Sequence, residues 1–222
     1  MRSLITLFLI LFVFGCNPEK KSRSKIEALE HVGESQKYAL GVACMEYISQ
    51  HGNNLPWSKI LVRKLIAAGF YPEAIYGVEL LLKKFPGEPE LLLLRSTAYR
   101  NLHQYGLAME DLQHGLKLQP GNDNLSQEVT ALNNEHELWK EIERLNQSLR
   151  GSPDSFPILL NRAEDFFKMR QYDAVLYDLG SLSKMRSPED SIYYTEKVIA
   201  LYKDNRRPVD MLAEMLEYFG RK

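Results

Sequence analysis

The sequence predicts an all-α solenoid of antiparallel helix pairs, with about five repeats after an N-terminal helical cap. Three observations lead to this prediction. Apolar residues recur at helical spacing through most of the chain, similar segments begin every 33 or 34 residues, and no strand-like alternation interrupts them. One pair of amphipathic helices of this length cannot bury its apolar faces alone, so neighbouring pairs must stack on one another.

The clearest repeat is residues 89–122. Leu92 and Tyr99 lie at helical spacing in its first helix. Its second helix opens at Tyr105 and ends before Pro120, because proline cannot continue a helix. The preceding repeat, residues 55–88, aligns with it without a gap. The matched pairs are Leu61 with Arg95, Leu65 with Tyr99, Tyr71 with Tyr105, Ala74 with Ala108, Val78 with Leu112, and Pro86 with Pro120.

This pattern resembles the tetratricopeptide repeat, which has 34 residues, an aromatic residue at the end of the first helix, a small residue in the second and a proline near the close. The resemblance implies a right-handed superhelix, whose concave groove is lined by the first helix of each repeat and binds a protein or peptide. It also implies the ligand-facing positions. Among these positions, a role in partner binding is predicted for Lys59, Arg63, Leu93, Thr97, Arg100, Asn101, Leu160, Glu164, Phe167, Lys168 and Tyr193.

Two kinds of side chain stand out in this predicted groove. Lys59, Arg63 and Arg100 would make its N-terminal half basic, which suits an acidic peptide or a free carboxylate. Apolar side chains such as Leu93 and Phe167 would suit a partner helix or an extended segment. The alternative is that these residues form only the solvated side of amphipathic helices.

Residues 123–155 form a degenerate repeat. Leucines keep the helical rhythm and Pro153 closes the segment, but Glu141 occupies the place of Ala74 and Ala108. The residues expected to form the turn, 133–136, contain no glycine. A hairpin and a single long helix are both compatible with this pattern, and the hairpin is the favoured prediction.

The remaining repeats are residues 156–189 and 190–222. The first recovers the pattern, with Ala163, Tyr172 and Val175 at repeat positions. In the second, Pro208 falls at the predicted start of a helix, where a missing amide hydrogen does no harm.

Residues 1–15 are predicted to be a lipoprotein signal peptide. A short cationic start precedes the apolar run 4–14, which is too short for a comfortable membrane span. The run ends in Val13, Phe14, Gly15 and Cys16, which resembles the lipobox of bacterial lipoproteins. The resemblance implies that Cys16 carries lipid, such as palmitate, and anchors the chain to a membrane. The alternatives are an uncleaved signal anchor and an ordinary signal peptide in which Cys16 is incidental.

The predicted cellular location follows from the same resemblance to lipoproteins. Asn17 stands where an inner-membrane retention signal of enteric bacteria would have aspartate, so the outer membrane, on its periplasmic face, is favoured. Residues 16–25, rich in lysine, arginine and serine, are predicted to be a lipidated flexible tether. Residues 26–54 are predicted to be a helical cap or a degenerate repeat, with an apolar face formed by Ala39, Val42, Ala43 and Tyr47.

The sequence offers little that could carry chemistry. It has no glycine-rich phosphate loop, no metal-ligand spacing and no serine in a nucleophile elbow, so no catalytic residue, metal or other cofactor is expected. A net charge of −1, without a long basic block, argues against nucleic acid as a partner. Cys44, the one cysteine besides Cys16, is interpreted as a small buried apolar residue.

These observations predict a non-enzymatic, lipid-anchored scaffold or adaptor that binds a protein or peptide partner in its groove. The expected setting, by family analogy, is cell-envelope assembly or secretion. One alternative is an accessory or regulatory subunit of a cell-wall-active enzyme. Another is a self-assembling structural envelope protein, because unfinished solenoid ends can stack.

Overall fold

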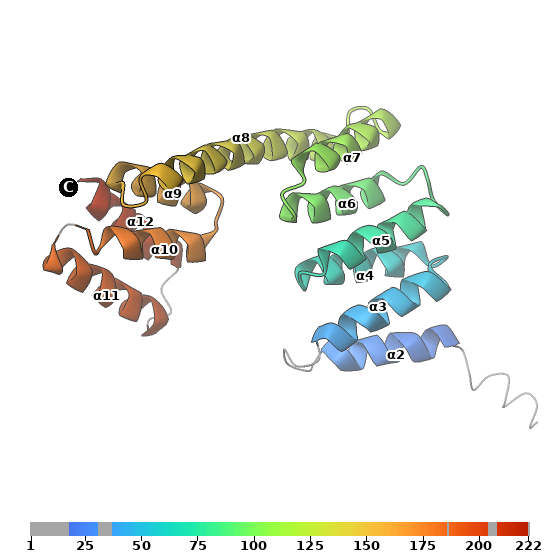
Figure 1. Ribbon diagram of the computed structural model, residues 1–222. Helices are drawn as coiled ribbons and strands as arrows, with labels where there is room; N and C mark the ends of the chain where they lie inside the picture. Colours follow the sequence, from blue (N-terminus) through green and yellow to red (C-terminus); the bar gives the residue numbers. More distant parts are fainter. Residues whose placement is uncertain (1–17, 31–36, 186, 204–207, 222) are drawn as a thin grey trace, which may run out of the picture. The chain divides into compact units, whose positions relative to one another are not determined.

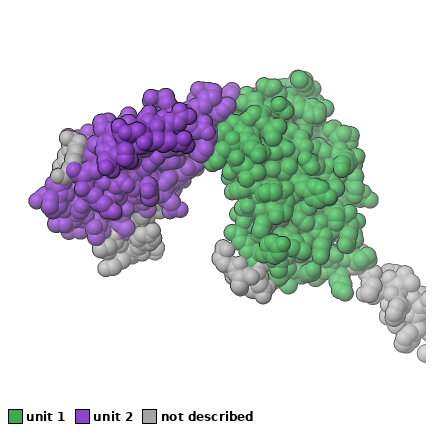
Figure 2. All heavy atoms as spheres, in the orientation of Figure 1, with its two compact units in different colours: residues 1–132 green, residues 133–222 purple. Residues whose placement is uncertain are grey.

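The computed structural model describes residues 18–30, 37–185, 187–203 and 208–221, and their regular secondary structure is helical throughout (Figure 1). The predicted signal peptide and the predicted lipidation site Cys16 lie outside the described residues. The chain divides into two compact units, 1–132 and 133–222, which Figure 2 colours separately. Within each unit, helices that follow one another in the sequence pack together, which confirms the prediction of an all-α fold of helix pairs.

The described part of unit 1 holds three helix pairs and the start of a long helix. The pairs are α2 (Pro18–Glu30) with α3 (Lys37–His51), α4 (Leu55–Ala67) with α5 (Tyr71–Leu82), and α6 (Pro89–Asn101) with α7 (Tyr105–Leu118). Helix α3 also packs against α4 and α5, and α6 packs against both α4 and α5. The small residues Ala74 and Ala108 are fully buried on the second helices, as the repeat pattern predicts for positions of close helix approach.

Unit 2 holds the remainder of the long helix α8 (Asp123–Gly151) and two pairs. These are α9 (Phe156–Lys168) with α10 (Tyr172–Leu182), and α11 (Pro188–Lys203) with α12 (Pro208–Gly220). Helix α12 also contacts α9 and α10. Its buried residues Leu212, Met215 and Phe219 join the core of the unit, so the C-terminal helix closes that core.

The turn inside each regular hairpin repeats the same backbone geometry. Gly69, His103 and Arg170 occupy equivalent positions and have φ angles of 81°, 56° and 60°. In each turn the next amide donates back to a carbonyl five residues earlier, at Leu65, Tyr99 and Phe166. This is the left-handed C-terminal cap that ends many helices. Glycine adopts it without strain, and two of the three repeats use a larger residue.

The prediction of a hairpin at residues 123–155 is wrong. The structure has one helix of 29 residues there, Asp123–Gly151, which is the alternative that the sequence left open. The chain does not turn at residues 133–136 because no glycine or proline ends the helix. Glu141 is not packed at a helix crossing, and its carboxylate pairs along the helix with Arg144. The helical rhythm of the leucines therefore continues without a break.

The predicted flexible tether is also wrong from Pro18 onward, because residues 18–25 form part of α2. Ile26 is fully buried in the core of unit 1, and Glu19 fixes the start of the helix. The Glu19 carboxylate accepts hydrogen bonds from the Tyr47 hydroxyl at 2.6 Å and the Asn54 amide at 3.0 Å. Arg23 pairs with Glu19 one turn along the helix and covers the Trp57 ring at 5.0 Å. These contacts hold residues 18–25 in a helix, although the basic composition of the segment predicts a flexible tether.

This contact predicts that α2 docks less firmly in acid. The hydrogen bonds from Tyr47 and Asn54 and the nearby Arg23 hold the pKa of Glu19 below its ordinary value of 4.5. A lowered pKa in the folded state means that Glu19 stabilises the docked helix above its ordinary pKa, and that this contribution is lost as the pH falls through the lowered pKa. We expect proteolysis within α2 to accelerate below pH 4.5. Acid-active pepsin digestion, followed by mass spectrometry, measures the rate.

The matched control is Glu19→Gln, which cannot ionise. Its digestion within α2 should already be fast near neutral pH with a neutral protease, and should change less with acid than that of the wild type. Equal pH profiles for the wild type and this variant would show that Glu19 does not hold the helix.

No helix of the described part is both long and apolar enough to cross a bilayer.

Candidate functional site

The predicted groove residues of unit 1 lie on the first helices of two successive pairs, α4 and α6. The Lys59 ammonium lies 3.3 Å from a Glu88 carboxylate oxygen and also pairs with Glu90, which in turn pairs with Arg63. Arg100 lies 3.2 Å from a carboxylate oxygen of Glu128. Each predicted cation thus has a carboxylate partner within the protein. The expectation of a basic groove is wrong, because carboxylates at the start of α6 and on α8 supply the counter-charges.

The pKa shifts agree with this pairing. Burial opposes the charge of Lys59, but its hydrogen bonds to Glu90 and Glu88 outweigh that effect and raise its pKa. The hydrogen bond from Lys59, together with the charges of Lys59 and Arg63, lowers the pKa of Glu90. The pairs are therefore charged near neutral pH. An acidic peptide would have to compete with Glu88 and Glu90 for the same cations.

The other groove positions of unit 1 are polar or half-buried. The Thr97 hydroxyl donates to the Leu93 carbonyl at 2.9 Å, and the Asn101 amide donates to the Thr97 carbonyl at 2.8 Å, both within α6. Arg63, Glu90 and Leu93 line one cavity of about 430 Å³. The structure thus brings two predicted groove residues, Arg63 and Leu93, together around a mainly polar space.

The predicted groove residues of unit 2 serve its own packing in large part. Leu160, Phe167 and Tyr193 are partly buried against the core of the unit. The Tyr193 ring stacks on Tyr218, with 3.8 Å between ring centroids and 16° between planes. Lys168 pairs with Asp165 at 2.8 Å, and Glu164 is exposed. Core packing accounts for the apolar character of these positions, and a role in partner binding stays a prediction.

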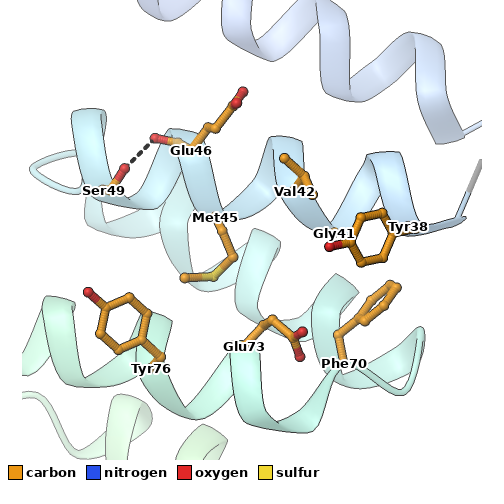
Figure 3. Close-up of a pocket in the computed structure, with 9 residues that line it drawn as sticks. All are labelled: Tyr38, Gly41, Val42, Met45, Glu46, Ser49, Phe70, Glu73 and Tyr76. Carbon is orange, nitrogen blue, oxygen red and sulfur yellow. Dashed lines mark hydrogen bonds between the residues drawn. The ribbon is translucent and has the colours of Figure 1, made fainter.

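A different surface of unit 1 gathers exposed apolar side chains. The groove between α3 and the N-terminal half of α5, the α3/α5 groove, has a volume of about 360 Å³ (Figure 3). Tyr38 and Tyr76 are 73% and 55% exposed, and Val42 is 41% exposed. The residues that line the groove are Tyr38, Gly41, Val42, Met45, Glu46, Ser49, Phe70, Glu73 and Tyr76. These helices are the second members of their pairs, so this surface is distinct from the predicted groove on α4 and α6.

Gly41 shapes one end of the α3/α5 groove. A Cβ atom at this position would lie 3.1 Å from the Phe70 ring, which is tighter than ordinary contact. The absence of a side chain lets the ring at the start of α5 pack directly on α3. Tyr38 then meets the edge of the same ring at 6.5 Å between centroids. The aromatic end of the groove is thus built on a close approach that only glycine allows without displacement.

One charged group of the groove stands out. The Oε2 atom of Glu73 is buried and has no hydrogen-bond partner among the described residues. Figure 3 shows its carboxylate on the side of α5 that faces α3, between Phe70 and Tyr76 along the helix. Glu46, the other carboxylate of the groove, lies at the surface and pairs with Lys25 at 3.1 Å. The lining residues that the structure describes include no lysine or arginine.

Sequence reasoning missed this groove, although α3 carries a signal for it. The sequence predicts Ala39, Val42, Ala43 and Tyr47 as one apolar face, but only the last two are buried, and Ala39 and Val42 are exposed. The buried face of α3 includes Cys44 and Ile48 beside them. Apolar residues therefore occur on two sides of this helix, which exceeds what packing on one core requires.

The repeats also hold a recurring ion pair that was not foreseen. In the α6 and α7 pair, Arg95 donates two hydrogen bonds to Asp111, at 2.8 and 2.6 Å. In the α9 and α10 pair, Arg162 does the same to Asp178, at 2.9 and 2.5 Å. Both pairs are separated by 16 residues and occupy equivalent repeat positions. We name them the Arg/Asp pairs. They join the two helices of a hairpin, and the hydrogen bond to Asp111 raises the pKa of Arg95.

Comparison with known proteins adds little beyond general likeness. No protein-family model matches the chain, and no curated protein matches it. Among solved structures, YrrB, described as a TPR protein with an unusual peptide-binding site, is 12% identical, with coverage of 81% of this chain and 93% of YrrB and a TM-score of 0.38. MamA 41-end from Desulfovibrio magneticus RS-1 is 15% identical, with coverage of 72% and 92% and a TM-score of 0.33. The fold described above rests on the helices and contacts of the chain itself.

Proposed function

We propose that this chain is a non-enzymatic scaffold that binds a protein or peptide partner through unit 1. The observation that supports this function is the α3/α5 groove, where exposed aromatic and aliphatic side chains surround a concave surface. Apolar side chains that gather in this way, instead of being scattered singly, are typical of interaction sites. Tyrosine is also enriched at protein interfaces, because its ring supplies contact area while its hydroxyl stays hydrated.

The setting of this scaffold is part of the proposal. Gly15, Cys16 and Asn17 support lipid attachment at Cys16 and a place on the periplasmic face of a bacterial outer membrane. Acyl chains hold a protein on a bilayer without a spanning helix, at about 0.8 kcal/mol per buried methylene. In this setting the scaffold would take part in envelope assembly or secretion, with its partner held close to the membrane.

Site-specific crosslinking in the native host tests the function. A photoreactive amino acid at Tyr38 should capture a partner protein that one at Lys140, an exposed residue of α8, does not capture. A probe at Arg63 distinguishes the predicted groove on α4 from the α3/α5 groove. The same strain with Cys16→Ser should lose the protein from the membrane fraction. Equal capture from Tyr38, Arg63 and Lys140 would contradict partner binding, and unchanged membrane association would contradict the lipid anchor.

A further inference from the structure

The Glu73 carboxylate determines which chemical group the α3/α5 groove would bind. Its buried Oε2 has no hydrogen-bond donor among the described residues, and the described residues that line the groove include no lysine or arginine. A carboxylate oxygen that is removed from water without a partner is costly, and the cost is recovered when a donor reaches it. A charged donor suits it best, because hydrogen bonds between ionised groups are stronger than those between neutral ones.

The surroundings of Glu73 favour an apolar neighbour for that donor. Met45 and Val42 line the groove from α3, and Phe70, just before α5, and Tyr76 on α5 line it on either side of Glu73 (Figure 3). Methionine adapts its shape to different apolar side chains. The aromatic rings can also receive the aliphatic stem or the charged end of a lysine or arginine. The groove therefore combines an apolar surface with one acidic side chain, Glu73, which is partly exposed and has one buried carboxylate oxygen.

We propose that the α3/α5 groove binds a peptide segment of a partner protein that places an apolar side chain next to a lysine or arginine, with the basic group paired to Glu73. This inference rests on the proposed function and names the chemistry of the partner. Glu46 contributes less to this selectivity, because it is exposed to solvent and already pairs with Lys25. The two carboxylates of one groove thus have different roles.

A random library of 12-residue peptides displayed on phage tests the inference on the full-length chain purified in mild detergent. We expect the wild type to enrich peptides with lysine or arginine beside an apolar residue. Glu73→Gln should lose the basic preference and weaken a selected synthetic peptide about tenfold in fluorescence anisotropy. Glu73→Lys should enrich acidic peptides instead. Glu46→Gln, the matched control, should change the affinity by no more than about twofold. Circular dichroism verifies that each variant is folded.

Each other outcome has a distinct meaning. Enrichment of apolar peptides without a basic preference, or unchanged affinity in Glu73→Gln, would overturn this inference and leave the scaffold function standing. A purified chain that is dimeric by sedimentation, and monomeric after Val42→Asp, would show that a second copy occupies the groove and would also overturn it. Enrichment that Val42→Asp and Tyr38→Ser do not reduce would place binding elsewhere, and would remove the groove as support for the proposed function.

Discussion

Asp178→Ala is expected to destabilise unit 2 by about 3 to 5 kcal/mol, because it leaves Arg162 without its carboxylate partner inside the protein. Asp178 is fully buried, and Arg162 is 15% exposed. Arg162 also donates to Asn146 at 2.6 Å, so one guanidinium joins α8, α9 and α10 within the unit. Removing the acid deprives this guanidinium of two of its hydrogen bonds.

Breaking the Arg162 and Asp178 pair and replacing both of its residues should have different effects on stability. A buried ion pair adds little over well-packed apolar residues of similar volume, because both charges lose their hydration. The double variant Arg162→Met with Asp178→Leu should therefore recover most of the stability that Asp178→Ala loses. If the double variant is as unstable as the single one, the loss of stability is not caused by an unpaired Arg162. The Arg162 and Asp178 pair would then stabilise unit 2 through its specific hydrogen bonds.

Urea unfolding followed by circular dichroism measures the change, and hydrogen exchange with mass spectrometry assigns it to a unit. Faster exchange should be confined to the helices of unit 2, with unit 1 unchanged. Lys140→Ala is the matched control, since it breaks an exposed pair with Glu137 on α8 and should leave the unfolding midpoint in place. A midpoint for Asp178→Ala equal to that of the wild type would show that the Arg/Asp pair does not stabilise the hairpin.

The regular repeats were predictable because their determinants are local. A small residue at a helix crossing, an aromatic residue at the start of the second helix and apolar side chains at helical spacing can be counted along the chain, and Ala74 and Ala108 are buried as the count requires. The Arg/Asp pairs were also visible in principle. Arg95 and Arg162 hold one repeat position, and Asp111 and Asp178 hold another.

The predictions that are wrong concern places where contacts between residues far apart in the sequence determine the local structure. Composition alone assigns residues 18–25 to a flexible segment, but Tyr47 and Asn54 meet Glu19 there and hold a helix. The basic character expected for the predicted groove depends on isolated side chains, and it is cancelled by Glu88 at the N-cap of α6, Glu90 on α6 and Glu128 on α8. The α3/α5 groove was missed for the same reason. Its two walls are separate stretches of sequence, and neither alone shows that one carboxylate oxygen of Glu73 is buried between them.

Ala108→Glu is expected to prevent stable folding of the α6 and α7 pair. Ala108 is fully buried on α7, at the position where the repeat pattern places a helix crossing. The longer side chain would overpack this crossing, and its carboxylate would be buried without a partner. Together these effects should exceed about 4 kcal/mol, which is exceptional for a single substitution. Circular dichroism and urea unfolding of the full-length chain measure the loss of helix and of stability.

Glu141→Ala makes the opposite exchange at the corresponding repeat position and should have little effect. Glu141 lies on the continuous helix α8, where its side chain is 41% exposed and pairs with Arg144 three residues along. The hydrogen bond from Arg144 lowers the pKa of Glu141, but the pair stays at the surface, where ion pairs stabilise little. The two exchanges thus separate sequence position from structural environment. If both variants unfold at the wild-type midpoint, the fold does not require close helix approach at Ala108. Helix packing would then not explain why the repeat has a small residue at this position.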